Sequence, residues 1–436
     1  MTGTPAAEPG TAQLHRLHPL TPVLRGFKYF SAIAALVSVR EMSQLGLART
    51  LQVLPVIVVA GFVLAYVSWR FTWYRIEGRE LHVESGVLFR RSRRVPLERV
   101  QAVDIVRPLI GRALGLAELR LEVVGQGASE APLAYLADEQ AHLLRDRLLA
   151  LAAGVDEHAP APAETVLARV PTRDLVVSVL LLSQVVVGLP VLVGLSVILL
   201  LVSVPVFLAS LPGLGPLAFG IFRTTVQRVL VEYGFTLARS ADGLRLRHGL
   251  LETRLQTVPP GRVQALRIVQ PVLWRRRDWA RVEVDVAGYG GDENEQLATR
   301  ALLPVAPMAI CRDLVDRIVG GGDVTGMPRR GVPSRAAWCD PVQWRRLGLG
   351  YSADVLVVSR GRVRRVLDVV PLAKAQSIRV VQGPWQRRLR LASLHVDTAG
   401  RRLSTEAAHR DLAEVQQLVE GLSDAARAER ERRRLP

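Results

Sequence analysis

The chain has 436 residues, which is enough for several domains. Hydrophobic residues make up 49% of it and aromatic residues only 5%, a composition that excludes an ordinary wholly soluble protein and predicts membrane segments beside globular ones. The net charge of +17 comes almost entirely from arginine, because Lys28 and Lys374 are the only lysines. Part of this basicity is the arginine usage of a GC-rich genome, and the remainder predicts an anionic partner, either lipid headgroups or nucleic acid.

The first candidate membrane segments lie within residues 24–70. Residues 50–69 carry no charge and end in tryptophan, as segments that reach a membrane interface do. The partner segment, residues 24–39, contains Lys28, whose ammonium must extend to the interface if the segment spans. We expect a transmembrane hairpin over residues 24–70 after an N-terminal cytoplasmic arm over residues 1–23, with a first segment lying in the interface as the alternative.

A soluble domain is expected over residues 71–155. It contains the densest basic cluster of the chain, Arg90, Arg91, Arg93 and Arg94. Basic groups near an anionic leaflet contribute about 1 kcal/mol each within a Debye length. These four arginines are therefore candidates for binding lipid headgroups; alternatively, they help to set the orientation of the chain and otherwise lie in water.

A second apolar region follows an Ala/Pro-rich linker over residues 156–173. Leu175 to Phe222 is 48 residues without a single charged residue or histidine, and one span needs about 20. We expect a second hairpin over residues 174–223, with spans near residues 174–194 and 198–222. Three places offer a turn: Gly188–Gly194, Pro205 and Pro212–Pro216.

The arginines that flank both hairpins indicate the orientation. Arginines precede and follow each hairpin, whereas the segments between the paired spans carry few charges or none. Basic residues concentrate on the cytoplasmic side of membranes. We therefore expect a multi-pass protein of a bacterial cell membrane with its termini and soluble domains in the cytoplasm.

Three segments of the soluble part repeat one pattern. Counting from Pro96, Pro259 and Pro371, each copy has a basic residue three positions on, a glutamine at five and an arginine at sixteen. The proline, the basic residue and the glutamine of each copy form the repeat signature. We interpret this signature as structural, with each glutamine satisfying backbone groups at a strand edge. It comprises Pro96, Arg99, Gln101, Pro259, Arg262, Gln264, Pro371, Lys374 and Gln376.

The arginine sixteen positions after each proline is the best candidate for a ligand-binding or packing residue shared by all three copies. Arg112, Arg275 and Arg387 occupy it. A guanidinium suits bidentate binding of a headgroup phosphate, but a structural role of the arginine in a loop that recurs in each copy fits the sequence as well. We count these three as headgroup-binding candidates and keep the structural alternative open.

Each copy alternates apolar and polar residues in short runs and closes with an amphipathic helical pattern. This order predicts small β-sandwich or open-barrel domains, each capped by a C-terminal helix. The second and third domains are expected over residues 224–320 and 336–424. A linker over residues 321–335 separates them, and a charged tail over residues 425–436 follows.

The chain resembles bacterial membrane-flanked-domain proteins that carry bacterial pleckstrin-homology-like (PH-like) domains. The resemblance covers most of residues 14–424, including the order hairpin, domain, hairpin, domain, domain. It rests on Leu17–Arg25, on Tyr233–Leu237 and on Gly383–Ser393. It implies a seven-stranded β-sandwich plugged at one end by a C-terminal helix, with no established activity and no catalytic residues.

No pattern of catalytic or metal-binding residues emerges from the sequence. The eight histidines are scattered, and Cys311 and Cys339 stand 28 residues apart in no metal-ligand spacing. We interpret the cysteines as two reduced thiols. The sequence therefore predicts a protein that is not an enzyme and needs neither cofactor nor metal.

The leading functional hypothesis is a membrane-anchored scaffold. Its three modules would bind anionic lipids or protein partners, including further copies of the chain, in an envelope stress response. A transport or channel role is the alternative, although Gln184 and a few serines are the only polar residues within the long apolar run. Nucleic-acid binding is a remote alternative and is not expected, since aromatic stacking residues are scarce.

Overall fold

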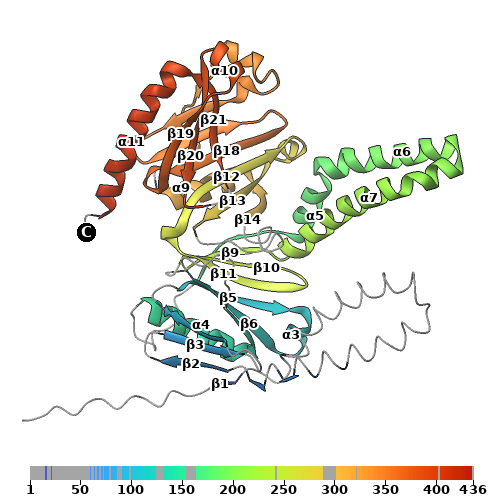
Figure 1. Cartoon of the computed structure of the whole chain (residues 1–436), viewed down its shortest axis with the longest axis vertical. Helices are drawn as coiled ribbons and strands as arrows, with labels where there is room; N and C mark the ends of the chain where they lie inside the picture. The colour runs from blue at the N-terminus through green and yellow to red at the C-terminus, as the bar shows by residue number, and fades with distance from the viewer. Residues whose placement is uncertain are drawn as a thin grey trace, which may run out of the picture. The chain divides into compact units, whose positions relative to one another are not determined.

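The computed structural model describes residues 73–434 apart from 78–79, 86–90, 98–99, 124–130, 154–163, 241–242, 288–300, 321 and 401–402; before residue 73 it describes only isolated positions. The expected first hairpin therefore lies almost wholly outside the described residues. The chain forms two compact units, residues 1–161 with 252–256, and residues 162–251 with 257–436. Both units are shown in Figure 1.

The first unit holds the first copy of the repeat, which is built from antiparallel strands in two groups. One sheet has the order β1-β2-β3-β4. The other contains β5, β6 and β7, with Glu252–Leu255 of β11 paired to β5. The elements are β1 (His15–Arg16), β2 (Trp73–Glu77), β3 (Glu80–Ser85), β4 (Arg91–Pro96), β5 (Val100–Pro108), α3 (Leu109–Ala113), β6 (Leu116–Val123), β7 (Ala131–Ala137) and α4 (Asp138–Ala153).

The core of this copy lies between the two groups of strands and α4. Leu81, Val103, Leu119 and Leu121 are fully buried, and Leu148 of α4 joins them. Because side chains alternate across a strand, the same strands present polar residues on their other face. Burial of one apolar face by a C-terminal helix is what holds the small sandwich together.

The second unit holds the second and third copies. The second copy comprises β8 (Thr165–Arg169), α5 (Thr172–Leu180), η2 (Gln184–Gly188), α6 (Leu189–Val202), α7 (Val204–Glu232), β9 (Thr236–Ser240), β10 (Gly243–His248), β11 (Glu252–Val258), η3 (Pro260–Arg262), β12 (Val263–Pro271), η4 (Leu273–Arg277), β13 (Trp279–Val286), β14 (Ala301–Pro307) and α9 (Met308–Val319). The third comprises β15 (Arg330–Gly331), η5 (Ser334–Trp338), η6 (Trp344–Arg346), β16 (Gly348–Tyr351), β17 (Val355–Arg360), β18 (Arg364–Pro371), η7 (Leu372–Lys374), β19 (Ala375–Val381), α10 (Pro384–Arg388), β20 (Leu391–Thr398), β21 (Thr405–Asp411) and α11 (Leu412–Arg434).

Each copy thus contributes seven strands and a C-terminal helix, as the resemblance implies. In each copy the first strand is short, pairs with the second, and is separated from it in sequence. In the second copy β8 and β9 are separated by the whole apolar hairpin. Residues 165–169 of the expected linker therefore form a strand, and the hairpin is inserted between the first two strands of a domain.

The second and third copies share one sheet. Strand β12 pairs with β18 from Leu266↔Val369 to Pro271↔Arg364, so the sheet has the order β14-β13-β12-β18-β17-β16-β15. The equivalent strand of the third copy, β19, pairs only with β20 among the described strands. Backbone hydrogen bonding therefore joins the second copy to the third.

The apolar hairpin consists of two antiparallel helices that project from the strands of the second copy (Figure 1). Two helical stretches are long and apolar enough to cross a membrane, Gln184–Val202 and Val204–Glu232. They meet at Ser203, whose extended backbone and side chain cap the N-terminus of α7. The turn lies beside Pro205, while Pro212 and Pro216 lie inside α7, so the expected boundary near residues 194–198 was several residues too early.

Side chains of the hairpin face outward rather than into a protein core. Leu201 is 81% exposed and Phe219 is 62% exposed, so these helices are not buried in the core of a soluble domain. The beginning of the charge-free run behaves differently, because Leu175 and Val179 of α5 are buried against the soluble domain. The start of the apolar run therefore belongs to the core of the soluble domain, and the part from Gln184 onward forms the membrane helices.

Candidate functional site

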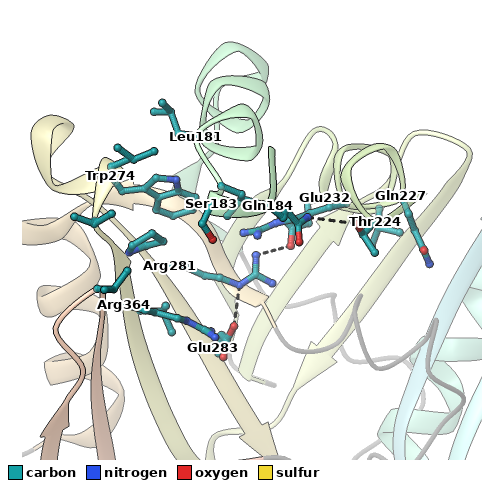
Figure 2. Close-up of a pocket in the computed structure, with 18 residues that line it drawn as sticks. Leu181, Ser183, Gln184, Thr224, Gln227, Glu232, Trp274, Arg281, Glu283 and Arg364 are labelled. Atoms are coloured by element: carbon teal, nitrogen blue, oxygen red, sulfur yellow. Dashed lines mark hydrogen bonds and ion pairs between the residues drawn. The ribbon is translucent and has the colours of Figure 1, made fainter. Parts of the chain in front are cut away.

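A cavity of about 440 Å3 lies where the hairpin joins the second copy (Figure 2). We call it the hairpin-base pocket. The end of α5, the start of η2 and the last turns of α7 form one side, and β12, η4 and β13 form the other. Its apolar wall includes Leu181, Leu182, Val272, Leu273 and Trp274, and its polar groups include Gln184, Thr224, Gln227 and Arg364.

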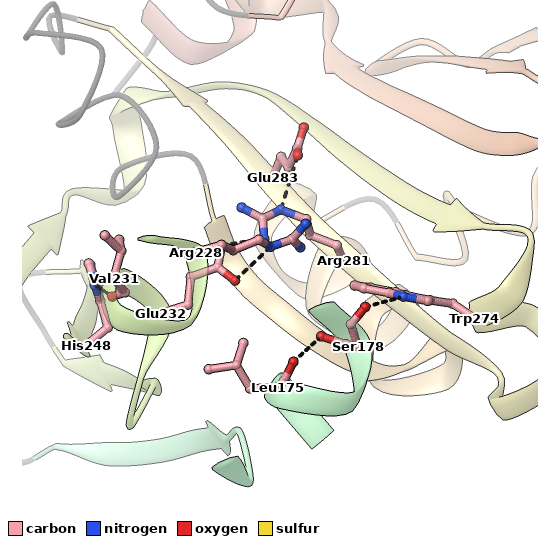
Figure 3. A network of polar contacts seen from close by, with 9 residues as sticks. All are labelled: Leu175, Ser178, Arg228, Val231, Glu232, His248, Trp274, Arg281 and Glu283. Carbon is pink, nitrogen blue, oxygen red and sulfur yellow. Dashed lines mark hydrogen bonds and ion pairs between the residues drawn. The ribbon is translucent and has the colours of Figure 1, made fainter. Parts of the chain in front are cut away.

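A buried network of charges holds one side of this pocket in place (Figure 3). Glu232, whose side chain is 4% exposed, accepts hydrogen bonds from Nε of Arg228 at 3.2 Å and from Nη1 of Arg281 at 2.5 Å. Nε of Arg281 in turn donates to Glu283 at 3.1 Å. The two arginines balance the two glutamates, so the network is neutral and its charges are satisfied internally.

Arg281 is the centre of the network. Burial by itself would lower its pKa, but the carboxylates of Glu232 and Glu283 raise the pKa above its ordinary value. The guanidinium therefore stays charged at any physiological pH. Because Glu232 ends α7 and Arg281 lies on β13, this ion pair connects the membrane helix directly to the domain sheet.

Trp274 anchors the other side of the pocket. Its side chain is fully buried, and its indole Nε1 donates to the carbonyl of Ser178 in α5 at 2.9 Å. The guanidinium of Arg228 lies 5.8 Å from the centre of the indole ring, within range of a cation–π interaction. Both ends of the hairpin are thus fixed to the same domain.

Gln184 stands at the entrance of the apolar helices rather than in their middle. Its Nε2 donates to Oγ1 of Thr224 on α7 at 3.3 Å. It also begins a short π-helical segment, a feature often found at functional sites. Gln184 therefore lies at the base of the hairpin, beside the soluble domain.

The basic cluster of the first copy is described only in part. Strand β4 begins at Arg91, and Arg94 is exposed on it. Arg90 lies outside the described residues, and nothing is described of the side chains of Arg91 and Arg93. Their role as headgroup ligands stays a prediction.

The arginine at sixteen falls on the same element in all three copies, the short helix after the fifth strand. Arg112 on α3 lies 3.4 Å from the hydroxyl of Thr253, and Arg387 on α10 is exposed. Arg275 on η4 donates to the carbonyl oxygens of Arg362, at 2.5 Å, and Val363, at 2.9 Å. In the second copy this arginine therefore ties its own domain to the β17–β18 turn of the next.

The repeat signature marks the passage from the fourth to the fifth strand. Pro96 ends β4, Pro259 follows β11 and Pro371 ends β18. Gln264 is buried and donates to the carbonyl of Arg262, whereas Gln376 is exposed. Nothing is described of the side chains of the matching residues of the first copy, Arg99 and Gln101.

Lys374 of the signature makes a contact between copies. Its ammonium donates to the carbonyl of Gly261 in the second copy at 2.5 Å. Arg262 occupies the equivalent position of the second copy, at the end of η3. The basic position of the signature therefore serves domain packing in the third copy.

Sequence reasoning named Gln184 of the hairpin-base pocket, as a candidate for a transport role, but not the residues of its buried charge network. Arg228 and Glu232 stand four residues apart directly after the charge-free run, which is the spacing of an ion pair on one face of a helix. That spacing was available in the sequence. Arg281 and Trp274 were not identifiable, because only the folded sheet brings them to the end of the hairpin.

The fold and this junction together define a class of protein, a membrane protein that carries repeated PH-like modules. The sequence profile described as "Bacterial PH domain" matches residues 31–152, 176–319 and 329–426. The chain therefore belongs to the bacterial PH domain family. The third match includes all seven strands of its copy, whereas the second begins after β8 and includes the apolar hairpin and the remaining six strands.

One relative is similar over a large part of the chain. It is the "UPF0699 transmembrane protein YdbT" of Bacillus subtilis (strain 168), which is 24% identical over 270 residues. The matched region is 55% of this chain and 54% of that protein. The chain thus spans about half the length of this relative.

Proposed function

We propose that the protein is a non-enzymatic, membrane-anchored scaffold that presents its PH-like modules at the inner leaflet of a bacterial membrane. In this role the modules bind lipid headgroups or protein partners. The proposal rests on one observation above all, the hairpin-base pocket. It joins an apolar wall to polar groups and to the exposed guanidinium of Arg364, beside the internally paired charges of Arg228, Glu232, Arg281 and Glu283, at the point where membrane helices meet a soluble domain.

The depth of the pocket suits the headgroup of an anionic phospholipid. The apolar helix begins at Gln184, and α7 carries arginines from Arg223 onward. The pocket between these two points would therefore lie where hydrocarbon gives way to headgroups. A lipid phosphate could meet the exposed guanidinium of Arg364, while its acyl chains follow the exposed apolar faces of α6 and α7.

The rigid connection between hairpin and domain supports the scaffold part of the proposal. The Arg281–Glu232 ion pair and the Trp274–Ser178 hydrogen bond fix the second copy against both ends of the hairpin. Through the β12–β18 pairing, the third copy is held at a set position as well. Such an arrangement would present binding surfaces in a defined orientation to the membrane.

Retention of lipid by the purified protein tests the pocket. The full chain is extracted in a mild detergent, and bound phospholipid is identified and counted by mass spectrometry. Changing Arg364→Gln together with Leu181→Trp should lower the retained anionic lipid about tenfold, because a hydrogen bond to a charged group contributes about 1.5–3 kcal/mol. The matched control, Arg239→Gln with Leu251→Trp, alters exposed residues outside the pocket and should leave retention unchanged.

Equal retention by both variants would contradict lipid binding in this pocket. The scaffold role has a separate test in cells. A strain without the protein is challenged with agents that damage the envelope and then complemented with the full chain or with the hairpins alone. Rescue by the hairpins alone would rule out the soluble modules as the functional part, and sensitivity of the deletion strain would support a role in envelope stress.

A further inference from the structure

A second cavity, of about 370 Å3, is lined to an unusual degree by arginine. Six of its seventeen lining residues are arginines, and none of these seventeen is acidic. Basic residues make up only 57 of the 436 residues of the chain, so the enrichment exceeds what composition alone produces. We call this cavity the arginine pocket; its arginines are Arg312, Arg329, Arg345, Arg346, Arg360 and Arg365.

Four separate segments supply these arginines. Arg312 comes from α9 of the second copy, and Arg329 directly precedes β15. Arg345 and Arg346 lie on η6, and the last two arginines flank the turn between β17 and β18. Guanidinium groups from distant parts of the sequence therefore converge on one cavity within the second unit.

The turn between β17 and β18 has a fixed geometry. Gly361 has a φ of +85°, and a Cβ at this position would lie 1.9 Å from the carbonyl oxygen of Arg364. Only glycine fits this conformation. Arg360 and Arg365 are thus held on either side of a defined turn rather than on a loop free to move apart.

Most of these charges have no carboxylate partner. Arg360 forms an ion pair with Asp368 at 3.2 Å, but Asp368 also binds Arg267. Arg329 donates to the carbonyl of Thr325 at 3.1 Å. Within the described residues, Arg312, Arg345, Arg346 and Arg365 form no ion pair, and Arg345 lies over the ring of Trp344 at 5.2 Å.

Five of the six arginines are exposed and Arg360 is half-buried, so their positive charge is accessible to a ligand from solvent. Like charges that line one cavity repel one another. Burial and the neighbouring Arg312 lower the pKa of Arg329. Burial, Arg365 and Arg346 likewise lower the pKa of Arg275 at the edge of this region. A bound anion would relieve this repulsion.

We propose that the arginine pocket binds a ligand that carries two or more phosphate groups. The planar guanidinium is the side chain best suited to bidentate binding of phosphate. A single phosphate would leave most of the six arginines unpaired, whereas two or three phosphates would balance them. The volume lies in the range of small-molecule sites, which excludes a long polyanion enclosed within the cavity.

The site is distinct from the hairpin-base pocket and goes beyond the proposed scaffold role. Arg312 belongs to the second copy and the other five arginines to the segment that begins the third. A bound polyphosphate would therefore bridge the two copies. It should raise the free energy of unfolding of the unit that contains both.

The test uses the full chain in a neutral detergent, with tripolyphosphate as the soluble probe. Thermal unfolding is followed at a constant ionic strength of about 0.15 M. Tripolyphosphate should raise the unfolding temperature saturably, whereas sulfate and inorganic monophosphate at the same ionic strength should not. Arg346→Gln with Arg365→Gln should weaken the apparent affinity about tenfold or more, since each substitution removes charge-assisted hydrogen bonds to phosphate.

The matched control, Arg239→Gln with Arg362→Gln, removes the same charge from exposed positions outside the pocket and should keep the affinity. Without ligand, the pocket variant should unfold at the same temperature as the unchanged chain or higher, because like-charge repulsion is reduced. This separates loss of binding from loss of folding. An equal effect of sulfate, or an equal loss in the control, would overturn the proposal.

A second arm distinguishes a soluble ligand from a lipid. The chain is placed in nanodiscs of phosphatidylcholine that contain either cardiolipin, with two phosphates per headgroup, or phosphatidylglycerol, with one. Stabilisation by cardiolipin that requires Arg346 and Arg365 would identify the ligand as a membrane headgroup, and stabilisation by tripolyphosphate alone would identify it as soluble. Absence of both effects would overturn the proposal.

Discussion

The side chain of Glu232 shows how one residue controls the junction between membrane and domain. It is almost fully buried and is the shared acceptor of Arg228 and Arg281. A buried carboxylate with two guanidinium partners is stable only while all three charges are present. Loss of Glu232 should therefore destabilise the junction between hairpin and domain more than substitution of exposed residues does.

Replacing Glu232→Gln should lower the free energy of unfolding of the second unit by about 3–5 kcal/mol, because Arg228 and Arg281 would keep buried charges without their shared partner. Chemical denaturation of the full chain in detergent measures the change. The control is Asp313→Asn in the exposed Arg317–Asp313 pair, which should cost less than about 1 kcal/mol. Equal losses in both variants would mean that the junction does not depend on the buried network.

The two cysteines provide a second test at the residue scale. Both are free. Cys311 is fully buried on α9, and burial, with a smaller effect of Asp278, raises the pKa of its thiol to about 12. Cys339 is only half-buried, and burial and Asp340 raise its pKa as well.

Maleimide labelling of the folded chain at pH 7 should therefore modify Cys339 and spare Cys311, since the thiolate is the reactive form and Cys311 is also inaccessible. Raising the pH to 9 should speed the reaction of Cys339 without exposing Cys311. Mass spectrometry after labelling, with and without denaturant, counts the modified thiols. Rapid modification of Cys311 in the folded chain would contradict the burial of α9 against the sheet.

At the scale of the elements, the β12–β18 pairing joins the second copy to the third. An arginine that recurs in both copies shows how this pairing changes the burial of its ion pair. Arg267 on β12 and Arg379 on β19 occupy the same position, eight residues after Pro259 and Pro371. Arg267 reaches Asp368 on the neighbouring β18, and that carboxylate is 1% exposed. Among the described strands β19 pairs only with β20, and there Arg379 binds Asp397, which is 34% exposed.

This equivalence gives a matched pair of mutations. Asp368→Asn should lower the free energy of unfolding by about 3–5 kcal/mol, because it leaves Arg267 and Arg360 without their buried carboxylate. Asp397→Asn should cost less than about 1 kcal/mol, because its ion pair is largely exposed to solvent. Denaturant titration of each variant in the full chain makes the comparison, and a larger loss for Asp397→Asn would contradict the role of the shared sheet.

The hydrogen bonds that Asp397 accepts determine how its contribution to stability depends on pH. Those from Arg379 and Ser377 lower the pKa of Asp397 from 3.8 to about 2. The lowered pKa means that its stabilisation is fully present above about pH 4 and is lost as the pH falls toward 2. The difference in free energy of unfolding between the unchanged chain and Asp397→Asn should accordingly shrink as the pH falls from about 4 to 2, and it should vanish below that range.

At the scale of the whole molecule, the orientation of the hairpin in the membrane decides on which side the soluble domains lie. Arg223 and Arg228 lie near the C-terminal end of α7, while the turn at Ser203 lies between two apolar helices. The distribution of basic residues predicts that the turn faces outward and that the domains face the cytoplasm. This remains a prediction that labelling can test.

Single cysteines are placed in a chain that carries Cys311→Ala and Cys339→Ser. A membrane-impermeant maleimide added to spheroplasts should label Val202→Cys, beside the turn, without lysis. Arg362→Cys, exposed on the β17–β18 turn, should be labelled only after lysis. The reverse pattern would contradict the orientation, and labelling of both positions before lysis would show that the spheroplasts were not intact.

The sequence by itself determined the features that depend on local pattern. The three-fold repeat, the apolar hairpin and the C-terminal helices follow from residue spacing and hydrophobicity, because a strand or helix must present one apolar face to its core. The recurring proline also marks the same point of each copy, the end of the fourth strand, where a missing backbone N–H does no harm. These features needed no knowledge of distant contacts.

Only the tertiary structure decided where the hairpin enters a domain and which charges meet. The first strands are short, and β8 pairs with a strand beyond the entire hairpin, so no local periodicity reveals it. The β12–β18 pairing, the Glu232–Arg281 ion pair and the arginine pocket likewise join residues that are far apart in the chain. Such contacts form because the folded sheets bring distant backbones into register, and a charge acquires its partner only when that register is complete.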